Sequence, residues 1–371
     1  MTDKLIIKRI PAASGGDIGL LTLNKPKALN ALDLDMAKAL FEQLSDWQHD
    51  DSIALVVLTS EGDKAFCAGG DIVSMYQAMR AQQHQVPDFL ADFFAREYQL
   101  DYLIHRYGKP VVVWGAGIVM GGGIGLLAGA SHRILTPSSR LAMPEITIGL
   151  YPDVGASYFL PRAPGKTGLF LGLTGASVNA TDGIYVGLGD YVLADDGFER
   201  FCDALESQHW VAGEVHDQLT ALCTTFELAK ADWPQGKLSV WQHEIDKVLG
   251  DCSSAPEAVK AILSCESNGD SWFERAKQGL TAGSPITMHL VWEQCKRGAE
   301  LSLEACFQME LIMSCRCGES GEFAEGVRAL LIDKDKQPRW LFNSVDDVPA
   351  DVVATHFTSP WTVNPLAGIG E

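Results

Sequence analysis

The sequence of 371 residues lacks several features that mark particular classes of protein. No apolar run is long enough to cross a bilayer, because the longest candidate, residues 118–130, is interrupted by glycines. Basic residues are also scarce: 29 Lys and Arg stand against 48 Asp and Glu, so the formal net charge is −19. A surface of this charge repels nucleic acid and anionic membranes, and we expect neither as a main partner. A phosphorylated small ligand stays open, since it needs only local amides or a few cations.

The cysteines lack the spacing of a metal or redox site. Nine are scattered along the chain, and residues 315–317 (CRC) are too close together for a common zinc or redox motif. We therefore expect buried thiols in a reducing compartment and no metal site. The first residues, 1–6 (MTDKLI), show neither a signal peptide nor an Arg-rich transit segment. On these grounds we expect a cytoplasmic protein.

Strand-like and helical segments alternate over the first half of the chain. Apolar residues recur at helical spacing from Leu32 to Trp47, which predicts an amphipathic helix. Together with the other segments this alternation is typical of α/β layers around a largely parallel sheet. After about residue 194 the pattern becomes mainly helical, and the tail is predicted to extend over the surface. The remaining expected elements are strands at 5–10, 18–23, 54–59 and 111–114 and helices at 71–83 and 88–106.

Two glycine-rich turns are candidates for ligand binding. Residues 64–71 (KAFCAGGD) and 117–125 (GIVMGGGIG) each combine a strand end with a helix start, where free N–H groups and the helix dipole can hold an anion. Two such turns facing each other would form an oxyanion hole. The glycines could instead serve close packing of helix on sheet, but their occurrence in both turns favours a ligand. A dinucleotide site is disfavoured, because the Gly-x-Gly-x-x-Gly spacing from Gly115 fails at Met120.

Two acids downstream of these turns, Glu145 and Asp153, are eight residues apart. Their neighbours are apolar and include proline and glycine, as in 141–144 (LAMP) and 148–152 (IGLYP). Carboxylates near apolar walls tend to have raised pKa values, which suits proton transfer or nucleophilic attack. The alternatives are that Glu145 is a surface acid and that Asp153 is the N-cap of a following helix.

These motifs together resemble the crotonase (enoyl-CoA hydratase/isomerase) superfamily. The resemblance covers roughly residues 5–195 and rests on the two glycine turns, on Pro144-Glu145 and on 183–192. Residues 143–162 and 323–335 further resemble the 3-hydroxyisobutyryl-CoA hydrolase subfamily. The resemblance implies an α/β fold with a crotonase-like ββα spiral core and an enlarged helical C-terminal region. It divides the chain into a core with an acyl-CoA site, 1–195, and a mainly helical region, 196–371.

The resemblance also assigns roles to individual residues. Gly70 and Gly122 would form the oxyanion hole for the thioester oxygen. Glu145 would be the principal catalytic carboxylate and Asp153 the second one. Glu97 matches a substrate-contacting glutamate of the subfamily, so that Glu97, Gly122, Glu145 and Asp153 would all bind substrate. Without the resemblance, Glu97 would be interpreted as an exposed helical glutamate.

One departure from the superfamily pattern bears on the reaction. Enoyl-CoA hydratases carry a second glutamate where this sequence has Gly125, and dienoyl-CoA isomerases also use an acid there. The resemblance therefore favours hydrolysis of a short branched 3-hydroxyacyl-CoA, with 3-hydroxyisobutyryl-CoA of valine catabolism as the preferred substrate. CoA would be part of the substrate, and no cofactor is implied. The alternatives are an enoyl-CoA isomerase or hydratase and an acyl-CoA-binding protein without turnover. Crotonase-like cores form trimers, so the chain could be a homo-oligomer unless the helices after residue 194 block this.

Overall fold

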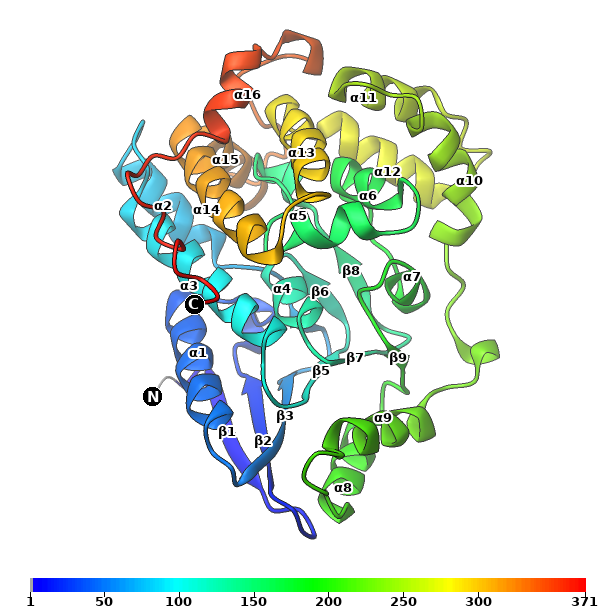
Figure 1. Ribbon diagram of the computed structural model, residues 1–371. Coiled ribbons are helices and arrows are strands. Elements are labelled where there is room, and N and C mark those ends of the chain that lie inside the picture. Colours follow the sequence, from blue (N-terminus) through cyan, green and yellow to red (C-terminus); the bar gives the residue numbers. More distant parts are fainter. Residues whose placement is uncertain (1–2) are drawn as a thin grey trace. The chain divides into compact units, whose positions relative to one another are not determined.

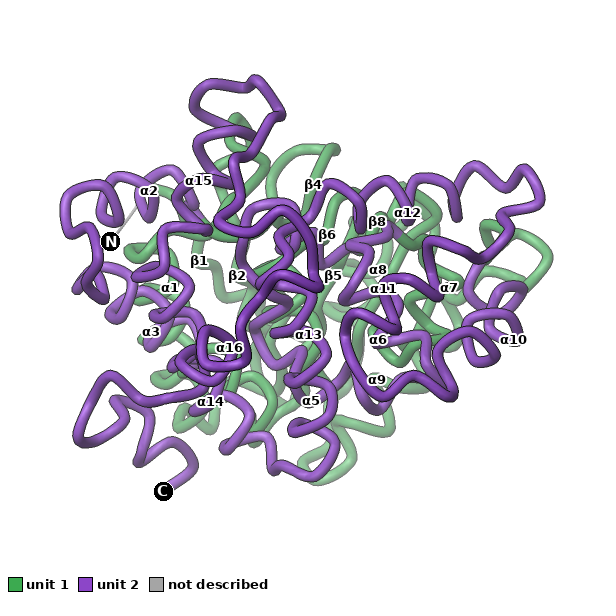
Figure 2. The backbone as a smooth tube through the Cα atoms, turned by 90° about the horizontal axis from the view of Figure 1, so that it is seen from above, with its two compact units in different colours: residues 1–70, 99–141, 178–236 green, residues 71–98, 142–177, 237–371 purple. Residues whose placement is uncertain are grey.

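The computed structural model describes residues 3–371, which fall into two compact units that interleave along the chain (Figures 1 and 2). Unit 1 comprises residues 1–70, 99–141 and 178–236, and unit 2 comprises residues 71–98, 142–177 and 237–371. Neither unit coincides with the predicted division at residue 195, because contacts in space define the units whereas the prediction followed the sequence. The assignment of the acyl-CoA site to residues 1–195 stays a prediction.

Unit 1 contains a six-stranded sheet in the order β1-β2-β3-β5-β7-β9. The first pair is antiparallel, and every later pair is parallel. This arrangement confirms the largely parallel sheet that the alternation of segments predicts. The strands are β1 Leu5–Ile10, β2 Asp17–Leu23, β3 Ile53–Ser60, β5 Val111–Gly115, β7 His132–Leu135 and β9 Tyr191–Val192.

Helices cover both faces of this sheet. On one face, alternate residues of the strands pack against α8 (Phe198–Ser207) and α9 (Val215–Phe226). On the other face lies the predicted amphipathic helix, α1 (Leu34–Gln48), whose Trp47 covers Gly19 so closely that a Cβ there would be 2.5 Å from the indole. Burying each Leu- or Val-sized side chain contributes about 1.5–3 kcal/mol. The apolar core between the sheet and helices α8 and α9 consists of Ile18, Leu20, Leu55, Val57, Val112, Trp114, Ile134, Leu193, Phe201, Leu205, Trp210, Leu219 and Cys223.

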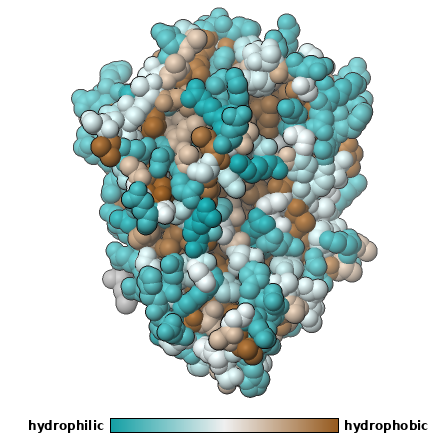
Figure 3. Space-filling view, in the orientation of Figure 1, coloured by the Kyte–Doolittle hydropathy of each residue, from teal (hydrophilic) through white to brown (hydrophobic). Residues whose placement is uncertain are grey.

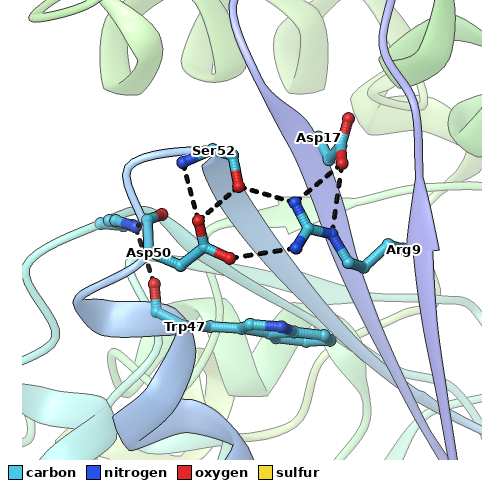
Figure 4. Close-up of polar contacts among 6 residues, drawn as sticks. Arg9, Asp17, Trp47, Asp50 and Ser52 are labelled. Carbon is cyan, nitrogen blue, oxygen red and sulfur yellow. Dashed lines mark hydrogen bonds and ion pairs between the residues drawn. The ribbon is translucent and has the colours of Figure 1, made fainter.

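The loop end of the β1-β2 hairpin is held by a cluster of polar groups around Arg9 (Figure 4). The Arg9 guanidinium donates to Asp17 of β2 and to Asp50 and Ser52, which precede β3. These side chains are partly exposed, and a single pair of this kind contributes about 0–1 kcal/mol. The cluster therefore fixes the position of the hairpin more than it stabilises the fold.

A second, three-stranded sheet has the order β4-β6-β8 and carries the two glycine turns. β4 (Ala65–Cys67) leads into α2 (Ile72–Ala81), and β6 (Ile118–Met120) leads into α4 (Gly122–Ala128). The prediction that both turns join a strand to a helix is confirmed. The other short elements here are β8 Arg140–Ala142, α7 Ala180–Tyr185 and the 3-10 turns at Pro26–Ala28 and Lys230–Asp232.

Unit 2 is built mainly from helices. Several of its helices begin at side-chain caps, such as Ser284, which accepts from Thr287 N–H ahead of Pro285 at the start of α13. All the elements described after residue 195 are helical, as the sequence predicts. The helices are α3 Asp88–His105, which continues into unit 1, α5 Ala156–Phe159, α6 Thr167–Thr174, α10 Leu238–Leu249, α11 Ala255–Ser264, α12 Ser271–Ala282, α13 Pro285–Gly298, α14 Leu303–Ser320, α15 Glu322–Val327 and α16 Ala350–His356. Shorter helical turns lie at Glu145–Ile148 (η2), Leu160–Arg162, Arg328–Ile332 and Val345–Asp347.

The tail differs from the extended surface segment that its composition predicts. It is rich in turns, Leu366 is buried, and Gln308 of α14 exchanges hydrogen bonds with Asn364 and Leu366. The Gly- and Pro-rich composition of the tail does not indicate this buried apolar contact, because a single residue, Leu366, makes it. The face drawn in Figure 3 is mainly hydrophilic, with hydrophobic residues in small groups. No helix within residues 3–371 has the length and apolar character needed to cross a membrane.

Candidate active site

The two glycine turns of unit 1 lie side by side because they follow neighbouring strands. β4 and β6 are parallel, with Cys67 opposite Val119, so their carboxyl ends share one edge of the sheet. Gly70 follows β4 by three residues, and Gly122 follows β6 by two. The turns are packed tightly: a Cβ on Gly123 would lie 2.3 Å from the Cys67 carbonyl oxygen. Only glycine allows this approach.

The backbone at each turn leaves an N–H group available to a ligand. Gly122 is the first residue of α4, so its N–H has no acceptor within the helix. The preceding Gly121 has φ +47° and ψ −122°, a conformation that side chains rarely allow. Gly69 has φ +106°, and its carbonyl oxygen accepts from Leu32 N–H in a bridge that does not use the Gly70 N–H. Gly70 and Gly122 are the two residues that the family resemblance predicts as oxyanion donors, and that role stays a prediction.

Glu145 occupies the first position of η2 in unit 2. Only 5% of it is exposed, so the alternative of a surface acid is wrong. Its Oε2 atom is buried without a hydrogen-bond partner. Burial, and next the charge of Asp153, raise the pKa of Glu145 well above its usual value. A carboxyl group of this kind binds protons strongly and is suited to proton transfer.

Asp153 is 4% exposed and lies in the loop before α5. It is not the N-cap of that helix, because Gly155 occupies the cap position, and glycine has no side chain to accept from the N–H groups of the first turn. Instead, Asp153 Oδ2 accepts a hydrogen bond of 2.7 Å from the Tyr98 hydroxyl. Burial raises the pKa of Asp153 to about 6, and the hydrogen bond from Tyr98 opposes this rise.

Glu97 on α3 is also buried, with 2% exposed, so the alternative of an exposed helical glutamate is wrong. Burial raises the pKa of Glu97 well above its usual value, and the charges of Asp153 and Glu145 raise it further. Unit 2 therefore brings together Glu97, Glu145 and Asp153, the three carboxylates that the sequence singles out. Because they repel one another in a dry environment, they bind protons more readily than exposed acids do.

The loop that carries Asp153 is held in a strained conformation. Val154 has φ +52°, which is rare for a β-branched residue. Glu310 of α14 accepts from the N–H groups of Gly155 and Ser157, each at 2.8 Å. Gln294 of α13 donates to the Pro152 carbonyl oxygen in the same loop. These contacts from two buried helices hold the carboxylate of Asp153 in place.

Sequence reasoning did not identify the residues that support the carboxylates. Glu310 and Ser314 lie on α14, and Tyr98 follows Glu97 directly on α3. The available signal was the position of Glu310 and Ser314 within a buried stripe that also includes Phe307. Polar residues in an apolar stripe are rarely buried without a partner.

The model of the Enoyl-CoA hydratase/isomerase family matches residues 18–357 of this chain. The chain belongs to the enoyl-CoA hydratase/isomerase family. Relatives in this family include the mitochondrial 3-hydroxyisobutyryl-CoA hydrolase of Xenopus tropicalis, 37% identical over 93% of this chain and 87% of that protein. The human protein of the same name is 33% identical, again over 93% of this chain and 87% of the relative.

Two solved structures extend this likeness to the fold. One is described as an enoyl-CoA hydratase from Rhodobacter sphaeroides 2.4.1, with a TM-score of 0.82, 32% identity and coverage of 96% of this chain and 98% of that one. The other is described as a carnitinyl-CoA dehydratase from Mycobacterium thermoresistibile, with a TM-score of 0.86, 32% identity and full coverage of both chains. The crotonase-like α/β fold that the sequence predicts is confirmed.

Within residues 3–371, no group of three or more His, Cys, Asp and Glu side chains is arranged to hold a metal ion. The nine cysteines are free thiols, and the four nearest the C-terminus, Cys295, Cys306, Cys315 and Cys317, are all buried on helices α13 and α14.

Proposed function

We propose that the protein hydrolyses a short, branched 3-hydroxyacyl-CoA thioester, with 3-hydroxyisobutyryl-CoA as the preferred substrate. The products are 3-hydroxyisobutyrate and CoA. The observation that carries the proposal is the identity of 33–37% over 93% of the chain with relatives named for this activity. The buried pair Glu145 and Asp153 supports it, because hydrolysis needs groups that accept and deliver protons. The reaction would serve valine catabolism and would use no cofactor or metal, with CoA entering as part of the substrate.

The reaction begins with the thioester carbonyl. The N–H groups of Gly70 and Gly122 donate to its oxygen, on which negative charge develops when a nucleophile adds to the carbon. A donor of this type is worth about 3–4 kcal/mol in acyl transfer, because it is already oriented before the charge appears. The position of Gly122 at the start of α4 supports this role, since the helix dipole also favours the oxyanion.

Glu145 acts at the carbonyl carbon by one of two routes. In the first, it takes a proton from water while the water oxygen adds to the carbon, and the C–S bond then breaks to release the thiolate of CoA. In the second, its carboxylate adds directly, the C–S bond breaks, and water then hydrolyses the acyl–Glu145 anhydride. In both routes Asp153 binds the 3-hydroxyl of the substrate or passes a proton to the departing thiolate. Heavy-oxygen label from water recovered in Glu145 after a single turnover would identify the anhydride route.

The second candidate function is addition of water to an enoyl-CoA, since the two solved structures carry hydratase and dehydratase names. That reaction uses a partner carboxylate at the position of Gly125 in this family. Gly125 is buried within α4 and has no side chain to supply one. Hydrolysis needs no group at this position and is therefore favoured.

The test is to incubate the protein with 3-hydroxyisobutyryl-CoA and, separately, with crotonyl-CoA. We expect release of free thiol from the first substrate and no loss of the conjugated enoyl absorbance of the second. Thiol release from neither substrate, together with tight binding of acyl-CoA, would favour the alternative of a binding protein without turnover. Loss of enoyl absorbance without thiol release would favour the hydratase.

Assembly and location are further parts of the proposal. A homo-oligomer is expected from the family, and sedimentation of the purified protein with and without acyl-CoA tests it. A cytoplasmic location is supported by the free cysteines, which suit a reducing compartment. Fractionation of the source cells with an antibody to the protein would test this location.

A further inference from the structure

The two carboxylates of the pair differ in their hydrogen bonding. Asp153 Oδ2 accepts from the Tyr98 hydroxyl at 2.7 Å, whereas Oε2 of Glu145 is buried without a partner. Tyr98 is itself fully buried, so that water cannot take over its role as donor. A negative charge shared between the two acids is therefore stabilised more strongly on Asp153.

The direction of the hydrogen bonds around Tyr98 follows from counting protons. Tyr98 has one hydroxyl proton, which it donates to Asp153, so in its 2.7 Å contact with Ser314 the serine must be the donor. Ser314 then has no proton left for its 2.9 Å contact with Tyr151, which must donate there. Tyr151 shares this proton with the carbonyl oxygen of Glu310 at 2.7 Å. The chain from Tyr151 through Ser314 and Tyr98 thus donates toward Asp153.

The other groups around Asp153 oppose its ionisation. The titratable groups that interact with it are Tyr98 and Glu97 on α3, Glu145 of η2, Tyr151, and Glu310 and Cys317 on α14. None of these carries a positive charge, and burial raises the pKa of Asp153. Among side chains, the hydrogen bond from Tyr98 is what counters burial. Donor chains of this kind strengthen each member, because each bond polarises the next.

We infer that Tyr98 is a positioning residue that keeps Asp153 ionised, and that Ser314 and Tyr151 set the direction of its hydroxyl group. The role of this charge in turnover rests on the proposed function. An ionised Asp153 increases the proton affinity of neighbouring Glu145, which suits the route in which Glu145 takes a proton from water. The network thereby separates the tasks of the two acids.

The first test follows Asp153 directly and needs no turnover. Protein labelled with ¹³C at the aspartate carboxyl carbon gives an Asp153 signal, identified by its loss in Asp153→Asn. We expect Tyr98→Phe to raise the titration midpoint of this signal by about one pH unit, because a hydrogen bond to the charged form is lost. The matched control is Tyr107→Phe, which removes a hydroxyl bonded to the Leu44 carbonyl oxygen in unit 1. The control should leave the midpoint unchanged.

The second test compares the pH dependence of kcat/KM for the same variants. Tyr98→Phe should move the acidic limb upward by the same amount as the titration, a shift that loss of packing alone would not cause. Ser314→Ala keeps the tyrosine and should move both readouts in the same direction by less, so it decides the matter if Tyr98→Phe does not fold. Unchanged titration of Asp153 in the folded variants would overturn the inference. A shifted titration without thiol release by the wild type would instead overturn the proposed function.

Discussion

The glycine turns of unit 1 are formed by backbone groups, whereas the carboxylates of unit 2 are held in place by other side chains. The turns offer backbone N–H groups, and their defining property is the absence of side chains, as the approach of Gly123 to Cys67 illustrates. The carboxylate cluster depends instead on side chains from α3, α13 and α14. A site formed by backbone groups can be recognised from a short sequence motif, because residues that are neighbours in the sequence form it. A site made of side chains draws on residues such as Tyr98 and Ser314, which are 216 positions apart.

The largest effect is expected at Glu145, the carboxylate whose Oε2 atom lacks a hydrogen-bond partner. Glu145→Gln keeps the shape of the side chain but removes the carboxylate that we propose takes the proton or attacks the carbonyl. We expect kcat to fall about 10⁴-fold while acyl-CoA still binds, measured by thiol release and calorimetry. Glu199→Gln on the exposed side of α8 is the matched control and should keep full activity. If Glu145→Gln kept more than about a tenth of wild-type kcat, the principal carboxylate would be another residue.

Asp153→Asn tests the second member of the pair. The amide can still accept from Tyr98, so that the hydrogen bond survives while the charge is removed. We expect kcat to fall about 10²–10³-fold, because an ionisable group at the reacting centre is lost. A variant with wild-type activity would return Asp153 to a structural role in its strained loop.

The comparison of the two regions also explains how far the sequence could predict the structure. The strands at 5–10 and 18–23 agree with β1 and β2 to within a residue, because short segments rich in Ile and Leu and bounded by turn residues favour strands. The two glycine turns, each joining a strand to a helix, were predicted equally well. By contrast, Glu310 reaches the N–H groups of Gly155 and Ser157 only after the chain has folded, and no spacing rule links these positions. The candidate acids were therefore predictable, but their supporting residues were not.

A smaller effect is expected when a side chain is added to the backbone site. In Gly123→Ala the new Cβ would lie 2.3 Å from the Cys67 carbonyl oxygen, so α4 and β4 must move apart. We expect kcat to fall about 10- to 100-fold, because the proposed donors, Gly70 and Gly122, would shift relative to the carbonyl that they are proposed to hold. Overpacking of this kind also costs about 1–3 kcal/mol of unfolding free energy. Gly108→Ala, where a Cβ meets nothing within 4 Å, is the control and should leave both quantities unchanged.

The smallest effect concerns the free energy of unfolding rather than the rate. Its pH dependence distinguishes the buried carboxylates, which titrate, from the backbone groups of the glycine turns, which do not. The pKa of Asp153 is raised from 3.8 to about 6 in the folded protein. At pH values between 3.8 and about 6, Asp153 holds a proton in the folded chain that it has released in the unfolded chain. The contribution of this proton to the free energy of unfolding is therefore fully present below about pH 4 and is lost as the pH rises through 6.

Asp153→Asn cannot titrate at this position, and it also removes a charge that raises the pKa values of Glu97 and Glu145. From pH 5 to pH 8 the wild type should therefore lose about 1 kcal/mol more unfolding free energy than the variant. Urea unfolding of both proteins at each pH measures this difference. Gly108→Ala, which changes no titratable group, should follow the wild type. A wild-type curve that rises relative to Asp153→Asn over this range would mean that Asp153 is stabilised, rather than destabilised, as a charged group. The donor chain through Tyr98 would then outweigh burial.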